Sequence, residues 1–128
     1  PRSFFPSRGG CPFANLGGCA TLDGPRGDVA GSARALGQFD DALPAMRAAL
    51  REHDLVFVTA DHGNDPTTGS SDHARECVPL LVAGPQVRTV SLGVRETFSD
   101  LGATVGEWLN VPFRGRGQSF LPALERGV

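Results

Sequence analysis

Apolar side chains recur at helical spacing between about Val29 and His53. They follow one another at intervals of three and four residues, which places them on one face of a helix: Leu36, Phe39, Leu43, Met46 and Leu50. Asp28 precedes this stretch and is a suitable N-cap. Pro44 lies within the stripe, so we expect the helix to kink or break there before it ends at His53.

Two short apolar runs after this helix predict strands. The first is Leu55–Ala60 and the second is Val78–Val82, and both are rich in valine and leucine with no charged residue. Such runs are typical of strands buried in a parallel sheet. Pro79 stands near the start of the second run, where a strand tolerates proline best.

A second helix is expected over about Phe98–Leu109. Thr97 and Asp100 have the spacing of a capping box at its start. Its apolar stripe consists of Phe98, Leu101, Val105 and Trp108. The order helix, strand, strand, helix, with a polar loop between the strands, predicts the α/β class.

The N-terminal region differs from the rest in composition. It is rich in glycine and proline up to about Gly27, which disfavours helices and strands. We expect residues 1–12 to form an irregular segment and residues 13–128 to belong to one core domain. The chain starts without methionine and reads as part of a longer sequence.

Charge and cysteine content narrow the classes of partner. The net charge is −2 and the pI is about 5.9, which gives no indication of a nucleic-acid partner. No apolar run is long enough for a membrane span, and no basic segment followed by an apolar stretch opens the chain, so we expect no signal peptide. The three cysteines lack metal-ligand spacing and predict reduced thiols in a cytoplasmic protein.

Potential metal ligands are concentrated in the loop between the predicted strands. Asp61 and His62 directly follow the first strand, and His73 comes eleven residues after His62. Asp65 and Asp72 lie in the same loop. Carboxylate and imidazole together suit Zn²⁺ or Mn²⁺. The alternative is a polar turn whose aspartates bind backbone amides.

Several segments together resemble a known family. The sequences Thr59–Asn64, Asp72–Glu76 and Val78–Val82 resemble the phosphopentomutases of the alkaline phosphatase superfamily. The resemblance extends from about Phe13 to Leu121 and includes the segment Ser91–Gly102. The cofactor-independent phosphoglycerate mutases of the same superfamily share the Asp-His-Gly sequence but differ around the second histidine.

The resemblance implies a fold and an activity. The expected fold is the C-terminal part of an alkaline phosphatase-like core: a partial three-layer parallel sheet with flanking helices, without the N-terminal part and the cap domain. The expected reaction is the interconversion of ribose (or deoxyribose) 1-phosphate and 5-phosphate through a phosphorylated threonine. A complete family site holds two Mn²⁺ ions. Asp61 and His62 match ligands of one ion, and His73 matches a ligand of the other.

The sequence departs from the family pattern at two expected ligands. Ala20 and Pro25 occupy positions where the family has aspartate and histidine, and Asp23 is displaced from the first of them by three residues. No threonine here matches the family's nucleophile, so no catalytic residue is assigned and the chain is expected to be inactive alone, with weak or absent metal binding. The alternatives are a non-catalytic remnant, or another phosphatase or phosphomutase of the superfamily.

Further expectations concern the geometry of the loop. Asp61, His62 and His73 should converge at the C-terminal edge of the parallel sheet. Asp65, Thr67, Thr68 and Ser71 either hold the loop or contact phosphate. Arg75 and Glu76 either pair with each other or orient the loop, and Arg75 is a further candidate for phosphate. The cap that would set substrate preference is absent, and neither the native metal nor the oligomeric state can be deduced.

Overall fold

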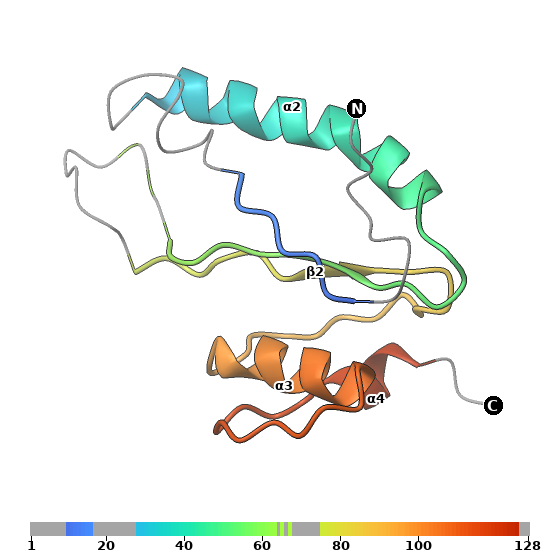
Figure 1. Ribbon diagram of the computed structural model, residues 1–128. Coiled ribbons are helices and arrows are strands. Elements are labelled where there is room, and N and C mark those ends of the chain that lie inside the picture. The colour runs from blue at the N-terminus through green and yellow to red at the C-terminus, as the bar shows by residue number, and fades with distance from the viewer. Residues whose placement is uncertain (1–9, 17–27, 64, 66, 68–74, 126–128) are drawn as a thin grey trace. The chain divides into compact units, whose positions relative to one another are not determined.

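The computed structural model describes residues 10–16, 28–63, 65, 67 and 75–125 (Figure 1). The chain divides into two compact units, which are treated separately below. The first unit comprises Pro1–Ala45 and Ala60–Val78. The second unit comprises Met46–Thr59 and Pro79–Val128.

Helix α2, Val29–Ala48, starts in the first unit where the sequence predicts it. The Asp28 carboxylate accepts a hydrogen bond from the Gly31 N–H at 2.9 Å, which confirms Asp28 as the N-cap. Arg34 lies 3.6 Å from the same carboxylate. The cap therefore satisfies one of the amides that a helix start leaves without an intrahelical partner.

The course of α2 differs from the prediction at its C-terminal end. Pro44 lies inside the helix and does not break it. The helix ends at Ala48, so the predicted end at His53 is wrong. Proline removes one amide donor and crowds the carbonyl four residues earlier. The helix therefore continues for about one turn past Pro44 without the hydrogen bond that the proline nitrogen cannot donate.

The buried face of α2 is also displaced by one residue from the predicted stripe. Gly31 and Ala35 are buried, whereas Leu36 is 62% exposed. Phe39 and Met46 are half-buried, as members of the predicted stripe. Small residues therefore line the N-terminal half of the buried face, which a search for large apolar side chains does not detect.

The two predicted strands exist but are shorter than expected and run in opposite directions. Strands β1, Val56–Val58, and β2, Leu81–Ala83, pair antiparallel in the second unit. The predicted parallel arrangement is wrong for this pair. A parallel pair needs a crossover connection, usually through a helix, and the described residues between the strands contain no helix. The larger three-layer sheet stays a prediction.

Both faces of this two-stranded sheet are apolar. Phe57 is paired with Val82, and both pack against a buried cluster formed by Phe120, Leu121 and Leu124. The Phe57 and Phe120 rings meet edge to face with centroids 6.5 Å apart. The opposite face carries Val56, Val58, Leu81 and Ala83. Successive residues of a strand point to opposite faces, so a sheet with two apolar faces has strands of uninterrupted apolar sequence.

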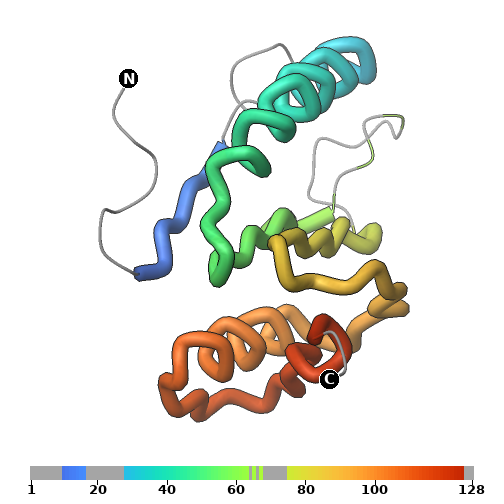
Figure 2. Tube along the Cα trace, turned by 90° about the vertical axis from the view of Figure 1, so that its right-hand side faces the viewer, coloured from blue at the N-terminus to red at the C-terminus, as the bar shows by residue number. Residues whose placement is uncertain are grey.

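Two helices cover the cluster side of the sheet. Helix α3, Ser99–Trp108, agrees with the predicted second helix to within one residue at each end. Helix α4, Leu121–Leu124, was not predicted because four residues are too few for a periodic stripe. The two lie side by side in both views (Figures 1 and 2). Arg88, which follows β2 in the sequence, donates from Nε to the Ala123 carbonyl at 2.7 Å and so holds α4 in place.

The predicted capping box at the start of α3 is wrong. Asp100 accepts from the Gln118 N–H at 2.9 Å and from Arg95 Nε at 2.8 Å, and it makes no side-chain cap at the helix start. The Gln118 amide, together with Arg95, holds the pKa of this buried carboxyl below its ordinary value. Phe98, expected in the apolar stripe, is 60% exposed.

Thr104 is the most deeply buried side chain of α3, with no accessible surface. Its hydroxyl donates to the Asp100 carbonyl at 2.8 Å and accepts from the Phe120 N–H at 3.0 Å. The second bond satisfies a buried backbone amide that comes immediately before α4. Thr104 and Asp100 therefore hold the same returning segment, at Phe120 and Gln118 respectively.

We predict that Thr104→Val destabilises the chain more than Thr104→Ser does. Valine keeps the volume but leaves the Phe120 N–H without its acceptor, at a cost of about 1–3 kcal/mol. Serine keeps the hydroxyl and loses one buried methyl group, about 1 kcal/mol. Urea unfolding followed by circular dichroism measures both differences. A Thr104→Ser variant that is the less stable of the two would contradict this account of the buried hydroxyl.

We also predict that Asp100 makes stability sensitive to acid. Because its pKa is lower in the folded chain than its ordinary 3.8, the unfolded chain takes up the proton first as the pH falls. Its stabilising contribution is present above that ordinary value and is lost as the pH falls through the folded pKa. Asp100→Asn should lower the urea midpoint at neutral pH and flatten its decline below about pH 4. The exposed Glu107→Gln on the same helix should leave the midpoint at neutral pH unchanged.

Candidate functional site

Asp61 and His62 follow β1 closely, as the sequence predicts. β1 ends at Val58, and the Asp-His-Gly sequence begins three residues later in the first unit. The Asp61 side chain is 85% exposed and the His62 side chain 39%. Asp61 Oδ1 lies 3.8 Å from His62 Nε2, so the two potential ligand atoms face each other.

A backbone hydrogen bond orients the imidazole. His62 Nδ1 lies 2.9 Å from the Gly63 carbonyl oxygen. Because a carbonyl only accepts, Nδ1 must carry the proton, and in the neutral ring the lone pair is then on Nε2. Metal-binding histidines typically donate their second ring nitrogen in this manner, which fixes tautomer and orientation.

The donor set fits a divalent cation. Imidazole nitrogen and carboxylate oxygen bind zinc at about 2.0–2.2 Å. Two atoms 3.8 Å apart can therefore both reach one ion of that size. Within the part of the chain that the structure describes, no group of three or more His, Cys, Asp or Glu side chains could hold a metal. Among the described residues, the candidate site thus consists of two potential ligands, Asp61 and His62.

The remaining candidates of the predicted site lie outside the described residues. These are Thr68, Ser71, Asp72 and His73 in the loop, and Ala20, Asp23 and Pro25 in the preceding segment. The expected convergence of Asp61, His62 and His73 therefore stays a prediction. Its expected setting, the edge of a parallel sheet, does not apply to the pair β1 and β2, which is antiparallel.

Asp65 and Thr67 hold a turn within the loop. Asp65 Oδ1 accepts from the Thr67 hydroxyl at 2.6 Å and from the Thr67 N–H at 2.9 Å. These two bonds, the hydroxyl bond first, lower the pKa of Asp65. The loop-holding alternative for this pair is therefore what the structure shows.

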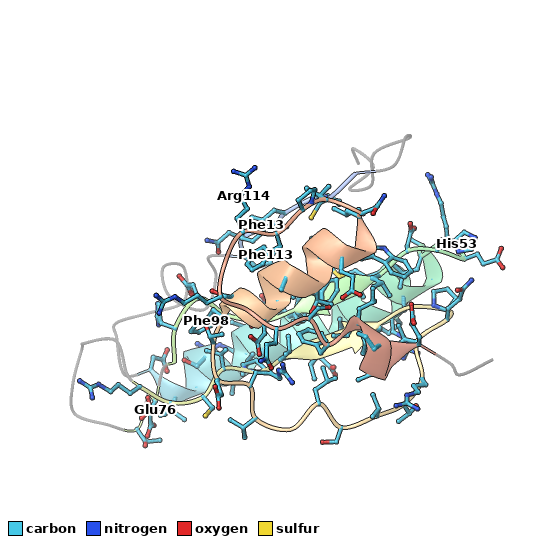
Figure 3. All side chains as sticks on the ribbon, turned by 90° about the horizontal axis from the view of Figure 1, so that it is seen from below. Phe13, His53, Glu76, Phe98, Phe113 and Arg114 are labelled. Carbon is cyan, nitrogen blue, oxygen red and sulfur yellow. The ribbon has the colours of Figure 1, made fainter. Side chains whose placement is uncertain are left out.

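The residues at the C-terminal end of the loop pack against the Asp-His-Gly segment. Gly63 is buried, and its backbone packs on the backbone of Glu76. Arg75 and Glu76 are both exposed and form no ion pair with each other, although both are described. In Figure 3 the Glu76 side chain extends away from the ribbon. Arg75 and Glu76 therefore do not pair with each other. The alternatives that they orient the loop, or that Arg75 binds phosphate, stay predictions.

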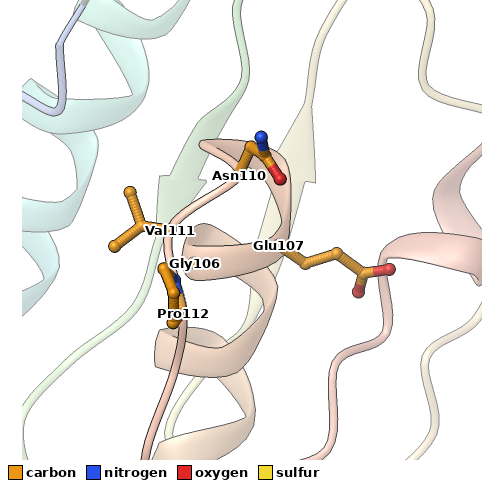
Figure 4. A pocket seen from close by; sticks show the side chains of 5 residues that line it. All are labelled: Gly106, Glu107, Asn110, Val111 and Pro112. Carbon is orange, nitrogen blue, oxygen red and sulfur yellow. The ribbon is translucent and has the colours of Figure 1, made fainter.

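A hollow lies at the C-terminal end of α3 (Figure 4). It is lined by Gly106, Glu107, Asn110, Val111 and Pro112. Glu107 is its only ionisable lining residue, so the hollow has no pair of groups for acid–base or metal chemistry. None of the described helices combines the length and the apolar character needed to cross a membrane.

Comparison with known proteins identifies the family. The Metalloenzyme superfamily matches residues 20–112. The phosphopentomutase of Dictyoglomus turgidum is 53% identical over 121 residues, which cover 94% of this chain and 31% of that protein. The phosphopentomutase of Herpetosiphon aurantiacus is 50% identical over 117 residues, 91% of this chain and 30% of that protein.

A third relative agrees with these two. The phosphopentomutase of Lachnoclostridium phytofermentans is 46% identical over 113 residues, 88% of this chain and 29% of that protein. The chain thus spans about a third of the length of the relatives it matches. These matches confirm the resemblance seen in the sequence. The chain belongs to the Metalloenzyme superfamily and is homologous to about a third of each of these phosphopentomutases.

Proposed function

We propose that these residues form part of a phosphopentomutase, an isomerase that moves a phosphoryl group within a pentose phosphate. The substrates would be ribose or deoxyribose 1-phosphate and 5-phosphate, in cytoplasmic nucleoside catabolism. The observation that carries the proposal is the Asp61–His62 pair at the end of β1, in a chain about half identical to named phosphopentomutases. The pair is chemically suited to hold a cation, which the reaction needs.

Asp61 and His62 would hold one divalent cation, which we propose to be Mn²⁺. The Gly63 carbonyl keeps the proton on Nδ1 of His62, so that in the neutral ring the lone pair is on Nε2. Asp61 supplies a negative oxygen 3.8 Å from that nitrogen. When bound, paired cations supply stabilisation of the charge on the attacking and leaving oxygens in phosphoryl transfer. His73 is proposed as a ligand of a second ion.

The nucleophile is proposed to come from outside these 128 residues. Thr59 and Thr67 belong to the motif segment itself, and Thr67 is engaged in holding the Asp65 turn. The relatives have about two thirds of their length beyond the matched part. We propose that this remaining part supplies the nucleophilic threonine, the cap and the missing metal ligands.

A second candidate function is a non-catalytic remnant of such an enzyme. Ala20 and Pro25 stand where the family resemblance implies an aspartate and a histidine ligand. Neither side chain has an atom that can bind a cation. A different phosphatase or phosphomutase of the superfamily is a third possibility, because the superfamily match alone does not distinguish substrates.

We predict weak Mn²⁺ binding that depends on His62. Two protein ligands leave most coordination positions to water, so calorimetric titration should show no tight two-site binding. His62→Ala should weaken the remaining binding by more than about tenfold, since even the outer partners of metal ligands contribute that much. His73→Ala should change little, because its two expected partners are replaced.

A matched control separates the site from general histidine binding. His53 is exposed in the second unit and interacts with the Gln86 side chain at 3.2 Å. His53→Ala should leave the titration unchanged. Two tight Mn²⁺ sites in the original chain, or an equal effect of His53→Ala and His62→Ala, would be incompatible with the assigned site.

We predict that the 128-residue polypeptide alone does not convert ribose 1-phosphate into ribose 5-phosphate in the presence of Mn²⁺. A mutase must position a nucleophile against bound cations, and these residues supply none. The assay uses protein from a host that lacks its own phosphopentomutase gene. Robust turnover by the purified chain would show that the chemistry is assigned to the wrong residues.

Restoring the altered positions distinguishes the two main candidates. The double variant Ala20→Asp and Pro25→His should strengthen Mn²⁺ binding without producing turnover. Turnover is expected only when the unmatched part of a relative, such as that of Dictyoglomus turgidum, is co-expressed or fused with the restored variant. Failure of that combination in a folded, associated complex would favour the non-catalytic remnant.

A further inference from the structure

We propose that Gly63 is a positioning residue for His62. In this proposal the backbone contact between Gly63 and Glu76 fixes the place of the Gly63 carbonyl, and that carbonyl fixes the imidazole. The inference deepens the proposed function, because it rests on His62 being a metal ligand. Its structural part, the orientation of the ring, can be tested without any metal.

The contact between Gly63 and Glu76 leaves no room for a side chain. A Cβ atom on Gly63 would lie 2.7 Å from the Glu76 nitrogen and 2.9 Å from its carbonyl carbon. Real Cβ atoms essentially never approach other heavy atoms so closely. Both neighbours are backbone atoms, which cannot turn aside as the end of a flexible side chain can. Any substitution at Gly63 must therefore move one of the two backbone segments.

Backbone conformation does not explain the glycine. Among the described glycines, only Gly93 has a positive φ, at 63°. Gly63 therefore has a φ that an alanine residue also adopts. The requirement for glycine at this position is the close approach of Glu76 and not a left-handed turn.

The same residue makes the hydrogen bond that orients the ring. The Gly63 carbonyl oxygen lies 2.9 Å from His62 Nδ1. Hydrogen bonds weaken steeply as their length and angle depart from the optimum. A displacement of Gly63 by a few tenths of an ångström would thus weaken the bond that holds the proton on Nδ1. The ring could then rotate or adopt the other tautomer. In either case Nε2 would no longer present its lone pair opposite Asp61.

The experiment measures the tautomer of His62 by ¹⁵N NMR in the metal-free chain. The spectra of all variants are recorded at the same pH, about 8. The original chain should show the proton on Nδ1 of His62. Gly63→Ala should shift His62 to the Nε2-protonated form or to a mixture of the two, and should weaken Mn²⁺ binding by about tenfold or more.

Two variants serve as controls. Gly37→Ala makes the same change inside α2, where a new Cβ meets nothing within 4 Å. It should raise the melting temperature, because alanine favours a helix, and it should leave the His62 tautomer unchanged. Glu76→Ala removes the exposed side chain but keeps the backbone contact, so the tautomer should again be unchanged.

Several results would overturn the proposal. Protonation of Nε2 in the original chain would do so whatever the variants show, even if Gly63→Ala fails to fold. An unchanged tautomer in a folded Gly63→Ala chain would do so as well, as would an equal shift in Gly37→Ala. Absence of Mn²⁺ binding in the original chain, with the tautomer results as expected, would instead contradict the predicted Mn²⁺ binding by His62 in this chain and leave the positioning role of Gly63 supported.

Discussion

The buried hydrogen bond between the Thr104 hydroxyl and the Phe120 N–H sets the position of the segment on which the second unit is built. It places Phe120 against α3, and the cluster that begins with Phe120 is what Phe57 and Val82 pack against. Asp100 reinforces the same segment two residues earlier through Gln118. Apolar burial stabilises the unit, but these polar contacts decide which apolar residues meet, because a buried amide must find an acceptor.

Local sequence features predicted much of the secondary structure. The Asp28 cap, the strand before Asp61 and the extent of α3 depend on neighbours in the sequence, and all three are present. Features decided by residues far apart in the chain were not predictable. The direction of β2 depends on the path of the loop, and the Asp100 carboxylate is taken by Gln118, eighteen residues away. The periodic pattern of α2 emphasised large side chains, whereas small ones are buried there.

The candidate site was predictable in composition but not in its internal geometry. A strand followed by Asp61 and His62 indicated cation chemistry, and the family match supports that interpretation. The sequence contained no indication of which imidazole nitrogen would carry the lone pair, because that depends on the carbonyl of Gly63. Nor did it indicate that Gly63 is required by a neighbouring backbone, since Glu76 is thirteen residues away and exposed. Glycine in such a motif is easily ascribed to a turn alone.

The division of the chain has a consequence for how such a motif can be inherited. The polypeptide passes between the two units after Ala45, Thr59 and Val78. The Asp-His-Gly loop is therefore encoded between two stretches that belong to the other unit. A genetic exchange that transferred only Ala60–Val78 would separate the loop from the strands that enter and leave it. Recombination should therefore preserve this motif mainly when it moves the loop together with β1 and β2, as a single block.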